Sequence, residues 1–135
     1  MKSQTQEDYI RAIYLLEIKQ GEVKSKELAG YLQVRKSSVS EMVSKLKEAG
    51  MLNCEKYSRL SLTKKARELA EKLTFKHRVI EAFLTNVLRR NKNEVHNEAH
   101  RLEHAFSDES IKRIYALIGK PTIGAHGEEI PSVRL

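Results

Sequence analysis

The sequence has little sulfur, few aromatic residues and no long apolar run. Its 135 residues include one cysteine, no tryptophan, six glycines and two prolines, and 6% are aromatic. The single Cys54 excludes an internal disulfide, and the low glycine and proline content argues against a disordered or low-complexity chain. No stretch approaches the roughly 18 to 20 apolar residues of a membrane span, and residues 1–4 lead straight into polar sequence rather than a signal core. We therefore expect a soluble, cytoplasmic protein of one or two small domains with no membrane partner.

Basic charge is what the chain has in excess. Lys and Arg number 25 against 18 Asp and Glu, which gives a formal net charge of +7. Residues 33–65 alone contain eight cations and three anions, so most of the excess charge lies in this segment. A concentrated basic segment favours an acidic partner such as nucleic acid. A membrane surface is not favoured, because no helix combines a basic face with large exposed apolar residues.

Hydrophobic spacing predicts three helices and a hairpin in the first half of the chain. Thr5 can cap a first helix that ends at Gly21, and Ser25 can cap a short second helix. A third helix follows the turn at 33–36, and its apolar residues fall at i, i+3, i+4 and i+7: Val39, Met42, Val43 and Leu46. Alternating apolar residues over 52–62 then predict a two-stranded hairpin.

The second half of the chain is predicted to be helical. Thr63 can cap a helix of about 25 residues, which is longer than one small domain needs. A further helix covers roughly 94–105, and a last one begins after Ser107 and ends near Gly119. From Thr122 onward, the apolar residues show neither helical nor strand spacing.

Helix, short helix, tight turn, helix and basic hairpin is the order of a winged helix-turn-helix. The face of the third helix opposite its apolar stripe carries mostly small polar side chains, which allow a helix to enter a major groove about 12 Å wide. Cations at the helix start and on the hairpin can meet phosphates. We expect DNA contacts from Arg35, Lys36, Ser37, Ser38, Ser40, Glu41, Ser44, Lys56 and Arg59. The alternative is a solvated helix face beside an ordinary surface hairpin.

Four of the five histidines lie between positions 77 and 104. At about 100° per residue, four side chains of one predicted helix share a sector of about 100° and can converge: His96, His100, Glu103 and His104. His77 and Glu81, four residues apart on the preceding helix, can face the same region. Imidazoles and carboxylates without sulfur suit divalent Mn, Fe, Co, Ni or Zn. The alternative is a set of exposed or core histidines with no ligand role.

The segment 100–104 also matches the H-x-x-E-H string of inverzincin proteases, in which two His bind zinc and Glu acts as general base. Such an enzyme needs a third ligand and a substrate cleft in a short chain already occupied by a DNA-binding fold. No other catalytic pattern occurs, so we expect no enzymatic activity.

Four segments carry a family resemblance: EDYIRAIY at 7–14, SSVS at 37–40, KHR at 76–78, and VHNEAHRLEH at 95–104 followed by SDE at 107–109. Through them the chain resembles the diphtheria-toxin-repressor family of metal-dependent transcriptional repressors. The resemblance implies a dimer that binds pseudo-palindromic operators when loaded with divalent iron or manganese and so represses metal-uptake genes.

The resemblance also implies two metal sites. Carried over by position, the primary site comprises Asp8, His100, Glu103 and His104, and the ancillary site comprises His77, Glu81 and His96. From the residues alone, Asp8 would be no more than a helix-capping acid. Asp8 and His100 stand where iron-type members have Met and Cys, and Arg11 stands where the manganese-type member has Glu.

Larger members of the family append a small β-barrel domain that lends ligands to the ancillary site. The chain resembles a short form without that domain. We therefore expect its ancillary site to be completed by water, an anion or Glu98.

We predict a mainly α protein. Its parts are a winged helix-turn-helix over 1–72, an all-α dimerisation and metal-binding domain over 73–120, and a tail over 121–135. The predicted function is a homodimeric repressor of double-stranded operator DNA with Fe(II) or Mn(II) as cofactor, for which other first-row ions can substitute. Two alternatives stay open, a winged-helix regulator with a non-metal effector and a small inverzincin-type metallohydrolase.

Overall fold

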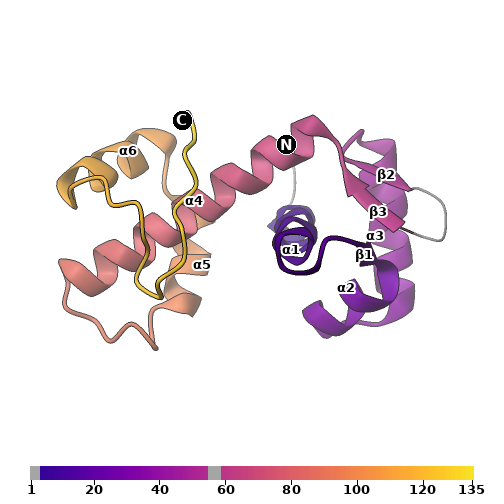
Figure 1. Ribbon diagram of the computed structural model, residues 1–135, viewed down its shortest axis with the longest axis horizontal. Coiled ribbons are helices and arrows are strands. Elements are labelled where there is room, and N and C mark those ends of the chain that lie inside the picture. The colour runs from indigo at the N-terminus through magenta and orange to yellow at the C-terminus, as the bar shows by residue number, and fades with distance from the viewer. Residues whose placement is uncertain (1–3, 55–58) are drawn as a thin grey trace. The chain divides into compact units, whose positions relative to one another are not determined.

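A computed structural model describes residues 4–54 and 59–135, which divide between two units, 1–71 and 72–135. The elements, in chain order, are α1 (Gln4–Gln20), β1 (Val23–Lys24), α2 (Ser25–Leu32), α3 (Lys36–Glu48), β2 (Leu52–Cys54), β3 (Arg59–Leu62), α4 (Lys64–Asn86), α5 (His96–Ala105) and α6 (Asp108–Leu117) (Figure 1). The mainly helical fold predicted from the sequence is confirmed. None of the described helices has the length and apolar character needed to cross a membrane.

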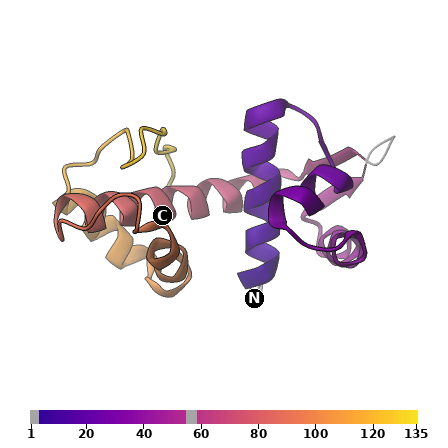
Figure 2. The same cartoon turned by 90° about the horizontal axis from the view of Figure 1, so that it is seen from below.

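Unit 1 is built on helices that each bury one face. In α3, Val39 and Leu46 are fully buried, as their helical spacing predicts. α1 packs against both α2 and α3, and contributes the buried Ile10 and Ile13 to the same core. Figure 2 shows α1, in indigo, along its length. Leu28 of α2 is also fully buried, so the three helices share one apolar core.

A three-stranded antiparallel sheet completes unit 1, with strand order β1-β3-β2. The predicted hairpin is confirmed: Leu52 of β2 lies opposite Leu62 of β3. β1 was not predicted, because two residues are too few to show an alternating pattern. Val23 of β1 pairs with Leu60 and is fully buried. The element order is that of a winged helix-turn-helix, and the expected DNA contact Lys56 lies outside the described residues.

Two of the four predicted helix caps are confirmed, and the one at Thr5 is wrong, because α1 already includes Gln4. Thr63 Oγ1 accepts a hydrogen bond from the backbone amide three residues later, at 3.3 Å. Ser107 Oγ does the same at the start of α6, at 3.1 Å. The prediction for Ser25 is wrong, because Ser25 is already helical and Lys24 precedes it. Instead, the Lys24 amide donates to the Glu27 carboxylate at 3.3 Å, so the acid in the first turn does the capping.

Unit 2 packs α5, α6 and the C-terminal segment around the last part of α4. Its core takes Val79, Ile80 and Leu84 from α4 and residues from every other element of the unit. The C-terminal segment adds Ile130, which is buried, and folds back on itself through a bridge between residues 123 and 129. The C-terminal segment, whose sequence shows no periodic spacing of apolar residues, is therefore part of the packed structure.

A charged cluster joins α4 to the start of α6 within unit 2. Lys72 Nζ and Lys76 Nζ lie 2.6 and 2.8 Å from the two carboxylate oxygens of Asp108. The Lys76 side chain is only 11% exposed, so Asp108 supplies the anion that a buried ammonium needs. Hydrogen bonds from Lys72 and Lys76 hold the pKa of Asp108 below its usual value.

Replacing Asp108 by Asn should destabilise the protein at pH 7 by about 1–3 kcal/mol, because Lys76 loses its counter-ion. A carboxylate with a lowered pKa contributes stability above its unfolded-state pKa and loses it as the pH falls through the folded-state pKa. The difference between the two proteins should therefore shrink below about pH 4. Urea denaturation at several pH values measures this. The exposed carboxylate of Glu109 provides the control, as Glu109→Gln; equal effects of the two substitutions would contradict a special role for Asp108.

Candidate metal centre and nucleic-acid surface

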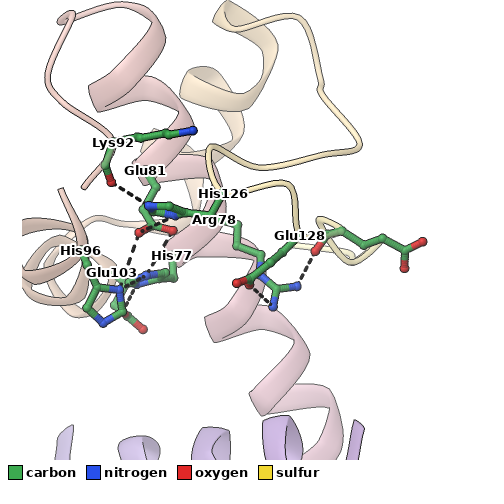
Figure 3. Close-up of polar contacts among 9 residues, drawn as sticks. His77, Arg78, Glu81, Lys92, His96, Glu103, His126 and Glu128 are labelled. Atoms are coloured by element: carbon green, nitrogen blue, oxygen red, sulfur yellow. Dashed lines mark hydrogen bonds and ion pairs between the residues drawn. The ribbon is translucent and has the colours of Figure 1, made fainter. Parts of the chain in front are cut away.

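Unit 2 brings together the three residues predicted for the ancillary site. His77 and Glu81 lie one turn apart on α4, and His96 is the first residue of α5. His77 Nε2 lies 3.1 Å from His96 Nδ1 and 3.3 Å from Glu81 Oε1 (Figure 3). One ligand atom from each residue lies within 4.8 Å of the other two, a spacing at which one cation can contact all three. We call these three residues the ancillary cluster.

Two members of the ancillary cluster are buried and influence each other's pKa. His77 is 8% exposed and Glu81 5%. Burial alone would lower the pKa of His77, but its interactions with Glu103 and Glu81 outweigh burial and raise that pKa. Burial alone would raise the pKa of Glu81, but His77, and then His126 and His96, lower it. Each side chain thus favours the charged form of the other, at a place where isolated charges are costly.

A fourth side chain, which the sequence analysis did not find, reaches the ancillary cluster from the C-terminal segment. His126 Nδ1 lies 3.5 Å from Glu81 Oε2 (Figure 3). Its Nε2 donates a hydrogen bond of 2.6 Å to the backbone carbonyl of Lys92. Sequence patterns could not place His126, because no helical or strand spacing links it to Glu81. Glu98, expected as a possible ligand, instead accepts a hydrogen bond of 2.6 Å from Arg90.

The surroundings of Glu81 Oε2 show whether the ancillary cluster is suited to a metal ion. The atom is buried, and among the residues that the structure describes it accepts no hydrogen bond. It faces His126 Nδ1 at 3.5 Å and His96 Nδ1 at 3.6 Å. Because Nε2 of His126 donates to the Lys92 carbonyl, Nδ1 is the ring nitrogen of His126 that faces the cluster as a potential ligand. Acceptors that face one another around a buried carboxylate are what a divalent cation satisfies, and nitrogen and oxygen donors without sulfur suit Mn, Fe, Co, Ni or Zn.

Residues 122–130 form a closed loop, which we call the tail loop, and Arg78 of α4 holds it. The Arg78 guanidinium donates to the carbonyl of Glu129 and lies 2.8 Å from the Glu128 carboxylate (Figure 3). Within the loop, the amide of Gly124 donates to Glu128 O and the amide of Ile130 to Thr122 O, each at 2.8 Å. Arg78 lies three residues before Glu81 on α4, so the same helix carries both the anchor of the loop and the carboxylate that His126 approaches.

The predicted primary residues divide between the two units. Asp8 lies on α1 in unit 1 and is half-buried, whereas His100, Glu103 and His104 lie on α5 in unit 2. The rings of His100 and His104 meet edge to face, with centroids 5.3 Å apart. Glu103 is 1% exposed, and His104 Nε2 lies 4.0 Å from its Oε2.

Glu103 is also hydrogen-bonded to the ancillary cluster. His77 Nδ1 lies 2.8 Å from Glu103 Oε1. A metalloprotease general base must be open to a metal-bound water. A carboxylate that is buried and already bonded to His77 does not meet that requirement, so the inverzincin-type hydrolase is not favoured.

The predicted DNA contacts of α3 form an exposed surface. Arg35 is the N-cap residue of α3 and has an extended backbone. Its side chain makes no hydrogen bond to the helix, so the first amides of α3 can bind other acceptors. The predicted contact residues of this segment are all exposed: Arg35, Lys36, Ser37, Ser38, Ser40, Glu41 and Ser44. Arg59 of β3 is exposed as well, and its guanidinium lies 3.4 Å from Glu22 Oε1.

Two family models match the chain, and together they cover nearly all of it. Residues 1–60 match the N-terminal DNA-binding domain of iron-dependent repressors. Residues 63–132 match the metal-binding and dimerisation domain of the same repressors. The border between the two matches falls at the end of β3.

Individual relatives agree with the family models. An uncharacterized HTH-type transcriptional regulator of Methanocaldococcus jannaschii is 39% identical over 120 residues, which are 87% of this chain and 95% of the relative. The manganese regulator SloR superposes with a TM-score of 0.83 at 38% identity, and a manganese-dependent transcriptional repressor in complex with manganese with a TM-score of 0.85 at 37% identity. Each superposition covers 94% of this chain but only 59% and 58% of the two solved proteins.

Replacing Arg78 by Ala should loosen the tail loop, because the loop loses its charged hydrogen bonds to α4. Each such bond contributes about 1.5–3 kcal/mol, so exchange of the Gly124 and Ile130 amides should accelerate by about tenfold or more. Hydrogen–deuterium exchange of the metal-free protein measures this. The exposed Arg113 provides the control, as Arg113→Ala. Unchanged exchange in the Arg78 variant would show that other contacts hold the loop.

Proposed function

The chain belongs to the iron-dependent repressor family, the diphtheria-toxin-repressor family that its motifs resemble, and on that premise we propose that it represses transcription by metal-dependent binding to operator DNA. Glu81 Oε2 is the observation that carries the metal dependence, because a buried carboxylate oxygen without a hydrogen bond among the described residues calls for a cation. The exposed face of α3 and the basic segment around it support the binding of double-stranded DNA.

Two sets of side chains are the proposed metal ligands. The primary set comprises Asp8, His100, Glu103 and His104, as the family resemblance implies. The ancillary set comprises His77, Glu81 and His96, and we add His126 because of its approach to Glu81. With a ligand from the tail loop, the ancillary set needs neither Glu98 nor a further domain to reach four protein donors.

Fe(II) or Mn(II) is the proposed cofactor. Both ions accept imidazole and carboxylate donors. Other first-row ions can substitute, because these nitrogen and oxygen donors suit several divalent ions of the first transition row. A bound divalent ion supplies the positive charge that neutralises the buried carboxylates and joins donors from different elements.

The primary donors link the binding of metal to the binding of DNA. Glu103, His100 and His104 present their donors from one face of α5, and Asp8 presents its carboxylate from the start of α1. The family resemblance implies that metal bound by the primary set favours the form of the protein that binds DNA. Metal then shifts the population of a dimer whose two α3 helices are competent to enter successive major grooves. Acting on operator DNA, the protein works in the cytoplasm as a homodimer and without catalysis.

Replacing Glu103 by Gln should abolish the gain of DNA affinity on metal addition while the metal-free affinity stays unchanged. The amide keeps the size of the side chain but removes the charge that a cation requires. Anaerobic binding to pooled genomic fragments with Fe(II), Mn(II) or chelator, at one stated salt concentration, measures this. Glu109→Gln is the matched control, since Glu109 is an exposed carboxylate of α6. If the unmodified protein binds the same fragments equally well with chelator, a non-metal effector is favoured instead.

Replacing Arg35 by Ala should weaken binding to all DNA sequences alike, because an arginine at the start of α3 contacts phosphate rather than bases. The slope of log K against log salt should become shallower by about one. Fluorescence anisotropy over a salt series measures the slope. Lys112, which is exposed on α6, provides the control as Lys112→Ala. An unchanged slope in the Arg35 variant removes this residue from the phosphate contacts.

A further inference from the structure

One acidic residue lies in the middle of the outward face of α3. Val39 and Leu46 mark the buried side of this helix. At about 100° per residue, Ser37, Glu41 and Ser44 lie on the opposite side, and all three are exposed. A glutamate side chain is longer than a serine side chain, so Glu41 can extend furthest from the helix within this group. In the element order of a winged helix-turn-helix, α3 is the helix that enters the major groove of DNA.

The negative charge of Glu41 is unfavourable on a surface that meets phosphates. Residues 33–65 contain eight cations and three anions, and a carboxylate among them repels the DNA backbone. Lys45 lies one turn further on, where it could form an ion pair with Glu41. Among the residues that the structure describes, however, neither Lys45 nor any other pairs with the Glu41 carboxylate. The carboxylate is therefore available to a ligand, and a hydrogen bond to that ligand would offset the repulsion.

The major-groove edges of the four bases differ in what they offer a carboxylate. Cytosine presents an amino donor at N4, whereas guanine presents acceptors at O6 and N7, and thymine presents an acceptor at O4. Adenine presents a donor at N6 beside the acceptor N7. An ionised carboxylate only accepts hydrogen bonds, so it pairs best with cytosine and is repelled by guanine and thymine. A serine hydroxyl donates and accepts, so Ser37 and Ser44 are compatible with any base.

We propose that Glu41 determines the base specificity of α3, by accepting a hydrogen bond from N4 of one cytosine in each half-site of the operator. The inference rests on the proposed function, in which α3 enters the major groove. Arg35 and Lys36, at the start of α3, supply phosphate contacts that are the same for every sequence. Glu41 adds attraction to one base and repulsion from others, and a repulsive contact helps to separate a specific site from other DNA.

Selection of binding sites from a random DNA pool, in the presence of Mn(II), identifies the base that Glu41 contacts. The unmodified chain should enrich sites with one fixed cytosine in each half-site. Glu41→Gln should replace that cytosine by adenine, because an amide pairs with N6 and N7 of adenine, and should leave the other positions unchanged. Glu68→Gln alters an exposed acid of α4 and is the control, which should enrich the same sites as the unmodified chain.

Affinities measured by fluorescence anisotropy test the contact itself. Replacing the C·G pair at that position by T·A should weaken binding of the unmodified chain by about 5- to 50-fold, the usual effect of one good base contact. Glu41→Ala should bind the two sites within about twofold of each other, because the contact that distinguishes them is already lost. This variant should also bind unrelated DNA more tightly than the unmodified chain, since a charge that repels phosphates is removed.

The possible results separate this inference from the proposed function. If the unmodified chain and Glu41→Gln enrich the same sites, the role of Glu41 is overturned and the proposed function is left intact. If Glu41→Ala weakens binding to every sequence alike, Glu41 only positions Lys45, and the role is again overturned. If the unmodified chain enriches no site with Mn(II), both fail. Circular dichroism of the variants ensures that folded proteins are compared.

Discussion

Two carboxylates, Glu81 and Glu103, are buried in unit 2, and the cost of keeping charge there determines what surrounds them. A carboxylate removed from water needs hydrogen-bond donors or cations in its place. Glu103 obtains a donor from His77, and Glu81 lies among three imidazoles. The helices of unit 2 and the tail loop are arranged so that these donors converge. Without the two acids, the histidines would be no more than polar residues at the edge of an apolar core.

Periodic patterns predicted the elements that carry the site. The stripe of Val39 and Leu46 located α3, and the caps at Thr63 and Ser107 located the starts of α4 and α6. Helical spacing also put His77 and Glu81 on one face, because two positions four residues apart are neighbours on any helix. These predictions succeeded because each depends on contacts between residues close in the chain.

Other features depend on pairs that no local pattern connects. β1 is two residues long and is a strand only because Val23 finds a partner in β3. His126 reaches Glu81 from the tail loop, which Arg78 and the buried Ile130 help to hold in place. The contact between His77 and Glu103 depends on the packing of α5 against α4, which side-chain volumes decide and spacing along one helix does not. Ser25 was misplaced as a cap because Glu27, two residues on, provides the carboxylate that the preceding amide uses.

The tail loop gives the ancillary site an order of assembly. During synthesis, α4 leaves the ribosome with only a histidine and a carboxylate one turn apart, which is a weak ligand pair. His96 follows with α5, and His126 comes last, since it lies in the segment that Arg78 anchors. The four side chains therefore come together only in a chain whose second unit has folded.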